Sequence, residues 1–530
     1  MSKTKKKKEV KQQYTVKNAV VNYYLLLMLT VFPLFYTNAH INIRHDKLYM
    51  FYALSGALIA CMLLILLVYF TERKNRPDDG TGKWYLQLSV TDYAFGAFAL
   101  CCVFSTVLSE YPWYAFRGIW YASTGRNNGL LLILCYFLVY IIVSRLYQFR
   151  DYVFPAAAAC SVIVSVLAVL HYFYIDPLGM YNGYNSYSIE NFMSTIGNKN
   201  IVSCYCCLMI PLFAVLYINC EKLWLRVLYA CSCAAVFAAL MCSDSDSGLL
   251  GLVPVMAVLL LFYSRKPAAL RSLFALTAYM LAGSKAVWLI SFAAQKRKGL
   301  GALQSSVVYG STGWILLAVF AAAAVALALV IGRNPDLTFP RFVPAALVGV
   351  YAAALLTLVG LFINYTFIDT TSQLNGTMKL FRFDDRWGTH RGFMWIRSWD
   401  IFKGFGLKDK LFGCGPDTFY SVFAPYFGEL EARFGDETTN CAHNEFLNYL
   451  ITTGVFGLTA YLVTFISAVA AAFKAARRNF LALAFCAPVL CYLIQSTVNI
   501  ATPIVTPLLF IFLALTVNIT RVVNKEKQGE

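Results

Sequence analysis

Long apolar stretches recur along nearly the whole chain, and each is about as long as a lipid bilayer is thick. A helix of about 17–25 apolar residues crosses the hydrocarbon core of a membrane. Such stretches begin near Ala19, Leu48, Thr91, Leu130, Tyr152, Ile201, Leu225, Gly248, Leu273, Gly313, Phe342, Glu445, Phe480 and Pro503. The sequence therefore predicts an all-α, polytopic integral membrane protein with about 14 transmembrane helices.

Composition leads to the same class. Apolar residues make up 59% of the 530 residues and charged residues 13%, against roughly 45–50% and 25% in soluble domains. The net charge of +17 indicates an excess of Lys and Arg in cytoplasmic loops, as is typical of membrane proteins. We expect no nucleic-acid partner. Most of the 16 cysteines lie inside apolar stretches, where they act as small hydrophobic residues. We expect neither a structural metal site nor a cofactor.

The distribution of Lys and Arg predicts the orientation. Residues 1–18 form a lysine-rich segment that we interpret as a basic cytoplasmic tail, followed by a retained first span rather than a cleaved signal peptide. An even number of spans puts both termini in the cytoplasm. Most short loops agree with this orientation, but the run from Lys296 to Lys298 falls on the predicted outer side.

One polar segment, residues 364–442, is far longer than the others and is predicted on the outer face. If its arginine-rich part is helical, Arg386, His390 and Arg397 share a face and Arg391 lies on a neighbouring one. This helix is either a membrane-surface helix with snorkelling arginines or a cradle for a lipid phosphate. Two cysteines of the segment, Cys414 and Cys441, could form a disulfide in an oxidising exterior.

At the end of this segment, His443 enters the next apolar stretch, HNEFLNYLITTGVFG. On a continuous helix, Gly454 would lie about 20° and Gly457 about 40° around the axis from His443. The glycines would let a neighbouring helix approach closely and so hold the imidazole in place. A histidine there could act as a general base on an alcohol, or be an interfacial residue without a function.

His443, Asn444, Gly454 and Gly457 fit the pattern His-[Asn/Ser/Gln]-x9-Gly-x2-[Gly/Thr/Tyr]. With the long loop before it, this pattern resembles the superfamily of O-antigen ligases and O-antigen polymerases, which also includes bacterial protein O-oligosaccharyltransferases. Less specific similarities are the Gly413–Gly415 turn, TGRNNG at 124–129 and GNKN at 197–200.

The resemblance implies a GT-C-like membrane glycosyltransferase of the bacterial plasma membrane. Such enzymes move a glycan from undecaprenyl diphosphate to an acceptor hydroxyl at the outer face, without a metal. By this resemblance His443 would be the catalytic base, with Asn444 beside it as a substrate-binding residue. Arg391, supported by Arg386, would bind the diphosphate, and Arg126 and Lys199 are weaker candidates for phosphate contact. Whether the enzyme is a ligase or a polymerase, and whether the acceptor is a glycan, lipid or protein, stays open.

The resemblance also predicts a division of the chain. We expect N-terminal helices in 19–224, a ligase-like core in 225–475 and C-terminal helices with a cytoplasmic tail in 476–530. One stretch departs from the family, because Ser243–Gly248 reads SDSDSG where many members have Ser-Arg. Its two aspartates could hold a metal, but an exposed turn is the commoner explanation.

The rival hypothesis is a lipid-linked glycan flippase or another secondary transporter. Transporters of this kind carry charges at mid-membrane. Lys285 is the one charge well inside an apolar stretch, which is too few for a convincing ion pathway.

Overall fold

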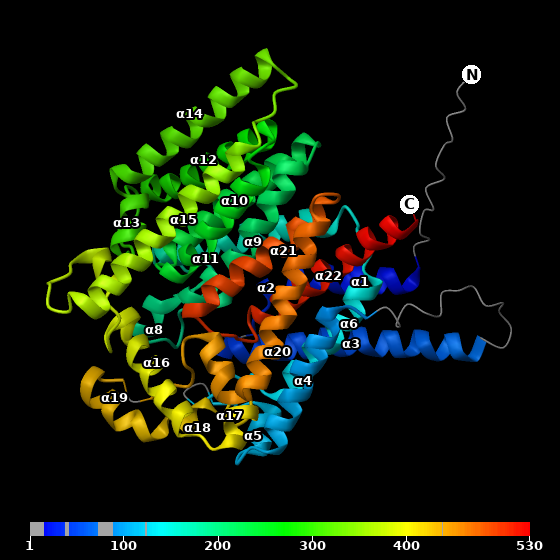
Figure 1. The fold of residues 1–530 in the computed structure, drawn as a ribbon, viewed down its shortest axis with the longest axis vertical. Coiled ribbons are helices and arrows are strands. Elements are labelled where there is room, and N and C mark those ends of the chain that lie inside the picture. The colour runs from blue at the N-terminus through cyan, green and yellow to red at the C-terminus, as the bar shows by residue number, and fades with distance from the viewer. Residues whose placement is uncertain (1–14, 38–41, 73–87, 122–123, 437, 530) are drawn as a thin grey trace.

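The computed structural model describes residues 15–37, 42–72, 88–121, 124–436 and 438–529. The described part of the chain is a helical bundle, with two residues in each of its two strands (Figure 1). The first helices are α1 (Val16–Leu29), α2 (Val31–Leu34), α3 (Ile43–Glu72), α4 (Val90–Val107), α5 (Pro112–Arg117), α6 (Leu130–Leu146), α7 (Val153–Tyr172) and α8 (Ser186–Asn191).

The middle of the chain contains β1 (Phe192–Met193), the 3-10 turn η4 (Ser194–Ile196), β2 (Gly197–Asn198), α9 (Lys199–Asn219), α10 (Leu223–Cys242), α11 (Asp246–Tyr263), α12 (Pro267–Ile290), α13 (Ala302–Val308), α14 (Ser311–Arg333) and α15 (Phe342–Ile363). The strands pair antiparallel, with Phe192 opposite Asn198.

The last part contains η5 (Asn364–Ile368), η6 (Gly376–Phe381), α16 (Trp387–Gly404), α17 (Leu407–Phe412), α18 (Phe419–Phe423), η7 (Ala424–Tyr426), α19 (Phe427–Phe434), α20 (Glu445–Ala475), α21 (Phe480–Gln495), η8 (Ser496–Val498) and α22 (Thr506–Gly529). Of all the helices in the described part of the chain, 13 are long and apolar enough to cross a membrane. The 17-residue α6 is a shorter apolar helix. The prediction of an all-α polytopic membrane protein is confirmed.

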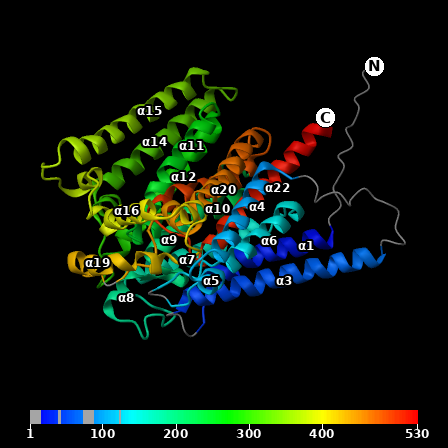
Figure 2. The same ribbon diagram turned by 60° about the horizontal axis from the view of Figure 1, so that its bottom comes forward.

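The bundle is organised around helices that are almost wholly buried. About 89% of the apolar window of α9 and of α22 is buried, whereas none of that of α15 is. α9 packs on α10 and α21, and α22 packs on α6, α20 and α21. α14 packs on α12 and α15 borders α11, both at an edge of the molecule (Figure 2), and both have the exposed apolar surface that suits contact with lipid.

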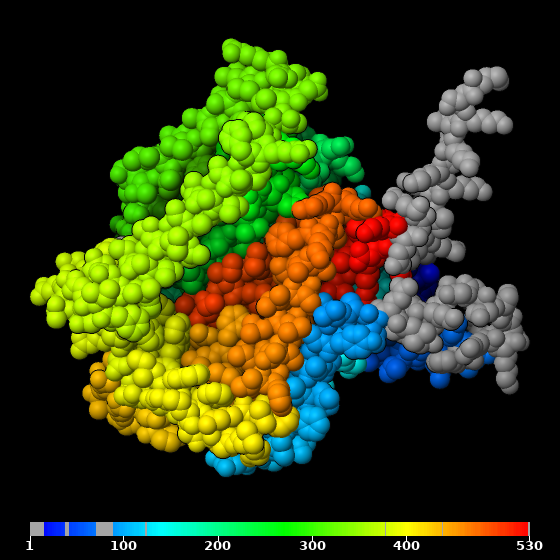
Figure 3. All heavy atoms as spheres, viewed as in Figure 1, coloured from blue at the N-terminus to red at the C-terminus, as the bar shows by residue number. Residues whose placement is uncertain are grey.

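The two described ends of the chain lie at the same end of the bundle. The Asn18 amide, at the start of α1, donates to the carbonyl of Leu146, and the Asn518 amide of α22 donates to Tyr147. We call this the terminal end. The segment 364–442 covers the opposite end, which we call the loop end (Figure 3).

Candidate functional site

The long segment at the loop end is a small folded unit of its own. Phe393, Phe419, Phe423 and Leu430 form a buried apolar cluster between α16, α18 and α19. The Arg397 guanidinium of α16 pairs with Glu429 of α19 at 2.7 Å. These contacts give the residues around the site a fixed position.

The Gly413–Gly415 turn meets a break in α20. Gly454 has φ 70° and ψ −175°, which interrupts the helix, and a Cβ there would overlap the carbonyl of Leu411. The carbonyls of Ile451 and Thr452, just before the break, accept hydrogen bonds from the N–H groups of Cys414 (3.1 Å) and Gly415 (3.0 Å). The break therefore ties the long segment directly to the membrane helix.

His443 lies outside the helix that follows it. Its φ of 48° is left-handed, and α20 begins at Glu445 with Asn444 as N-cap, whose side-chain oxygen accepts from Leu447 N–H at 3.0 Å. The predicted helical face shared by His443, Gly454 and Gly457 is therefore wrong, because the chain is non-helical at both His443 and Gly454. Close backbone approach at Gly454 does occur.

Cys441 lies between His443 and Arg126. The Nη2 of Arg126 is 3.4 Å from Cys441 Sγ, and the His443 side chain is hydrogen-bonded to the same thiol. Burial alone would raise the pKa of Cys441, but the Arg126 guanidinium and the His443 imidazole lower it to about 6. A thiol in this setting is charged near neutral pH.

Arg391 approaches the same group from α16. Its guanidinium is largely buried, Nη1 donates to Gly388 at 2.8 Å, and Nε has no hydrogen-bond partner among the described residues. Burial lowers the pKa of Arg391, while Cys441 and Asp246 oppose this, which places both within electrostatic range. A buried guanidinium with an open N–H suits an anionic group of a substrate.

Arg386 does not join this cluster. Gly388, Thr389 and His390 all have positive φ values, so regular helix resumes only after His390. The predicted face with Arg386, His390 and Arg397 is therefore wrong. Arg386 is exposed, and its backbone N–H donates to Asp384. His390 pairs with Asp436 at 3.1 Å.

Lys199 lies at the start of α9, where it acts electrostatically on Asp244. Asp244 accepts a hydrogen bond from Gly301 N–H at 2.6 Å and Asp246 one from the Gln304 amide at 2.8 Å. Among the described residues, no three side chains of the types that bind metals lie close together. The two aspartates instead hold Gly301 and the first turn of α13, next to the Asn200 side chain that accepts from Ser245.

Of the cations that broke the charge pattern, Lys298 holds backbone and Arg297 lies over the Tyr309 ring. The Lys298 ammonium is buried and donates to the carbonyls of Ile189 (2.6 Å) and Phe192 (2.7 Å). The Lys285 ammonium donates to the carbonyls of Val308 and Gly310, both at 2.9 Å. Lys285 therefore holds the connection between α12 and α14. This contact accounts for the charge of Lys285 without the ion pathway of a transporter.

Two buried acids of the site were missed by the sequence interpretation. The Asp417 carboxylate accepts from the N–H groups of Ile119 (2.7 Å) and Arg126 (2.9 Å), and burial raises its pKa to about 6. Glu445 is 1% exposed and accepts hydrogen bonds from the hydroxyls of Tyr461 and Tyr492. Only the adjacency of Glu445 to His443 could have pointed to it in advance.

All the cysteines lie in the described part of the chain, and all are free. The Cys414 thiol donates to the Ile451 carbonyl at 3.3 Å, and Cys441 contacts Arg126. The disulfide considered from the sequence is not formed.

Fold and site together define a polytopic membrane protein whose basic cluster lies beneath a folded loop. A family model described as O-antigen ligase matches residues 302–462, from α13 into α20. Residues 302–462 therefore form an O-antigen ligase domain, which supports the superfamily that the histidine motif predicted. The protein is a membrane glycosyltransferase of the O-antigen ligase or polymerase type. Among curated proteins, none matches the chain.

Proposed function

We propose that the protein transfers a glycan from undecaprenyl diphosphate to an acceptor hydroxyl at the outer face of the bacterial plasma membrane, with both termini in the cytoplasm. The observation that carries the proposal is that His443 and Arg126 both contact Cys441 at the loop end, with Arg391 within electrostatic range of the same thiol. The catalytic unit in this proposal is 225–475 together with the Arg126 loop. The donor has an anionic diphosphate and the acceptor a hydroxyl, and the cluster offers cations for one and a base for the other.

In the proposed reaction the His443 imidazole takes the proton of the acceptor hydroxyl. The acceptor oxygen attacks the anomeric carbon, and the bond from that carbon to the diphosphate oxygen breaks with inversion. The leaving diphosphate keeps the electron pair of that bond. Arg391 stabilises its growing charge, with Arg126 and Lys199 as further cations, and no metal takes part.

The test is turnover of purified full-length protein with an undecaprenyl-diphosphate-linked oligosaccharide and excess EDTA, followed by release of the lipid diphosphate. We expect release that depends on a glycan acceptor, and products whose size separates a ligase from a polymerase. Failure to release lipid diphosphate across several donors and acceptors would contradict the proposal and favour a test of lipid-linked glycan flipping in vesicles.

The His443→Ala variant should lose transfer by about 100-fold or more, since general-base catalysis contributes about that much. His390→Ala is the matched control, because His390 lies in the same loop segment but pairs with Asp436 at its surface. Equal activity in His443→Ala and wild type would remove the proposed base.

The Arg391→Lys variant should lose most of its transfer rate, because a point charge does not reproduce a planar guanidinium fork. Arg433→Lys serves as control, since Arg433 pairs with Asp385 and Glu429 on the surface of the same unit. Full kcat in the Arg391→Lys variant would move the diphosphate site elsewhere.

A further inference from the structure

The loop between α5 and α6 that carries Arg126 is held by two ionised side chains of opposite sign. From the start of α3, the Arg44 guanidinium donates to two of its carbonyls, those of Gly125 and, at 3.0 Å, Trp120. From the Gly-Pro turn, the Asp417 carboxylate accepts from two of its N–H groups, those of Ile119 and Arg126. The cation thus takes backbone acceptors and the anion takes backbone donors.

Asp417 is itself firmly placed. It follows the turn whose N–H groups bond to Ile451 and Thr452 at the break in α20, and its carboxylate is buried, with 7% of the residue exposed. Its φ of 61° turns the backbone so that the chain can continue into α18. The carboxylate therefore connects the helix that follows His443 with a loop nearly three hundred residues earlier.

This arrangement determines where the Arg126 guanidinium lies. The Arg126 backbone N–H is bound to Asp417, and its side chain then reaches across to Asn440 Oδ1 (Nε, 2.7 Å) and to Cys441 Sγ (Nη2, 3.4 Å). Both of those residues lie just before His443 in the chain. A displaced loop would carry the guanidinium away from them.

We propose that Asp417 and Arg44 are positioning residues, which clamp the described parts of the loop, 118–121 and 124–129, between the start of α3 and the Gly-Pro turn and so hold Arg126 beside Cys441 and His443. Neither residue needs to touch substrate in this proposal. The effect on transfer rests on the proposed function, whereas the effect on the loop does not.

The proposal predicts a specific requirement for a carboxylate at 417. An ionised carboxylate only accepts hydrogen bonds, so both its oxygens can face N–H groups. In Asp417→Asn one oxygen becomes an NH2 donor that would face a backbone N–H, and the charge opposite Arg44 and Arg126 disappears. A buried donor left facing a donor is among the costliest polar substitutions.

The first experiment is hydrogen exchange of the full-length protein, followed by mass spectrometry of peptides that cover 118–129. In Asp417→Asn we expect these amides to exchange about tenfold faster or more, because their charged acceptor is lost. Asp409→Asn is the matched control: Asp409 lies in α17 and pairs with the neighbouring Lys408 on the surface. Unchanged exchange in a folded Asp417→Asn protein would overturn the clamp.

If Asp417→Asn does not fold, Arg44→Gln tests the clamp from its other side. It removes the charge that holds Trp120 and Gly125 but leaves Asp417 in place, and the same peptides should exchange faster. Unchanged exchange in the folded Arg44→Gln protein would equally overturn the proposal.

The second experiment is a double-mutant cycle on lipid diphosphate release. If Asp417 acts through Arg126, Asp417→Asn should lower kcat about tenfold in wild type but less than about twofold in an Arg126→Ala background. A merely structural role would lower kcat equally in both backgrounds and would contradict the proposal. If the wild-type protein releases no lipid diphosphate, the proposed function fails, and the exchange experiment alone decides the clamp.

Discussion

Cys441 shows how single residues acquire their chemistry from neighbours that the sequence keeps far apart. The thiol is buried, which by itself disfavours the charged form. Arg126, more than three hundred residues earlier, and His443, two residues later, reverse that preference. Arg126 is the first of the neighbouring groups that favour the thiolate form of Cys441.

The thiol of Cys441 should therefore stay ionised down to a pH of about 6. Its folded-state pKa lies below the ordinary value of 9.0, so its contribution to stability is complete above about pH 9 and is lost as the pH falls to about 6. The measurement is the pH dependence of the rate at which iodoacetamide alkylates Cys441 in the folded protein, since the thiolate is the reactive form.

Two arginine variants control this prediction. Arg126→Ala should move the midpoint of alkylation to higher pH, whereas Arg433→Ala, at the surface of α19, should leave it in place. An unchanged midpoint in Arg126→Ala would show that the guanidinium does not stabilise the thiolate.

Among the elements, the break in α20 explains why one position of the histidine motif, Gly454, is a glycine. The carbonyls of the residues before the break accept hydrogen bonds from the Gly-Pro turn. The Ser105 hydroxyl of α4 also donates to the Thr452 carbonyl, at 2.7 Å. The close approach of the chain at Leu411 leaves no room for a side chain at Gly454. The same backbone geometry sets the loop segment against both α4 and α20.

Gly454→Ala should destabilise the protein by about 2 kcal/mol or more, because alanine is disfavoured at positive φ and its methyl group would overlap Leu411. Gly349→Ala in the exposed helix α15 is the matched control, since a Cβ there meets nothing within 4 Å. The readout is the thermal midpoint in detergent. A midpoint as high as that of the control would show that the break relaxes without cost.

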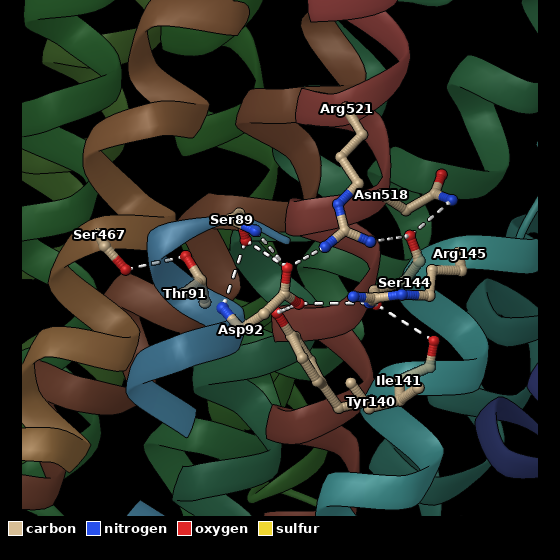
Figure 4. A network of polar contacts seen from close by, with 10 residues as sticks. All are labelled: Ser89, Thr91, Asp92, Tyr140, Ile141, Ser144, Arg145, Ser467, Asn518 and Arg521. Atoms are coloured by element: carbon tan, nitrogen blue, oxygen red, sulfur yellow. Dashed lines mark hydrogen bonds and ion pairs between the residues drawn. The ribbon is translucent and has the colours of Figure 1, made fainter. Parts of the chain in front are cut away.

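Across the molecule as a whole, a buried charge network joins three helices at the terminal end (Figure 4). Asp92 of α4 accepts from Arg145 of α6 at 3.2 Å, from Tyr140 at 2.7 Å and from Arg521 of α22. The side chains of Asp92 and Arg145 are 2% and 4% exposed. The network fastens the last membrane helix to the first half of the chain.

Asp92→Asn should cost about 3–5 kcal/mol, because it leaves two guanidiniums in a buried site without their counter-charge. Asp151→Asn is the matched control: its carboxylate pairs with Lys222 at 3.9 Å, and both side chains are mostly exposed, so its loss should cost less than about 1 kcal/mol. Equal melting temperatures for the two variants would contradict this role.

The class of the molecule and the elements of its fold could be predicted from residue order alone. Apolar stretches of bilayer length allow few structures other than spanning helices, and the predicted starts near Ala19, Leu130 and Glu445 lie within three residues of α1, α6 and α20. The short motif from His443 to Gly457 sufficed for the superfamily, because it is local in the chain.

Which residues meet at the site, in contrast, depends on how the chain closes on itself in three dimensions. Periodicity assumes a continuous helix, and that assumption failed at Gly388–His390 and at Gly454, where positive φ values redirect the chain. Asp417 and Arg44 could not be found from the sequence, because their partners are backbone groups of a distant loop and backbone groups leave no signature in residue types. Long-range hydrogen bonds of that kind exist only once the bundle has closed.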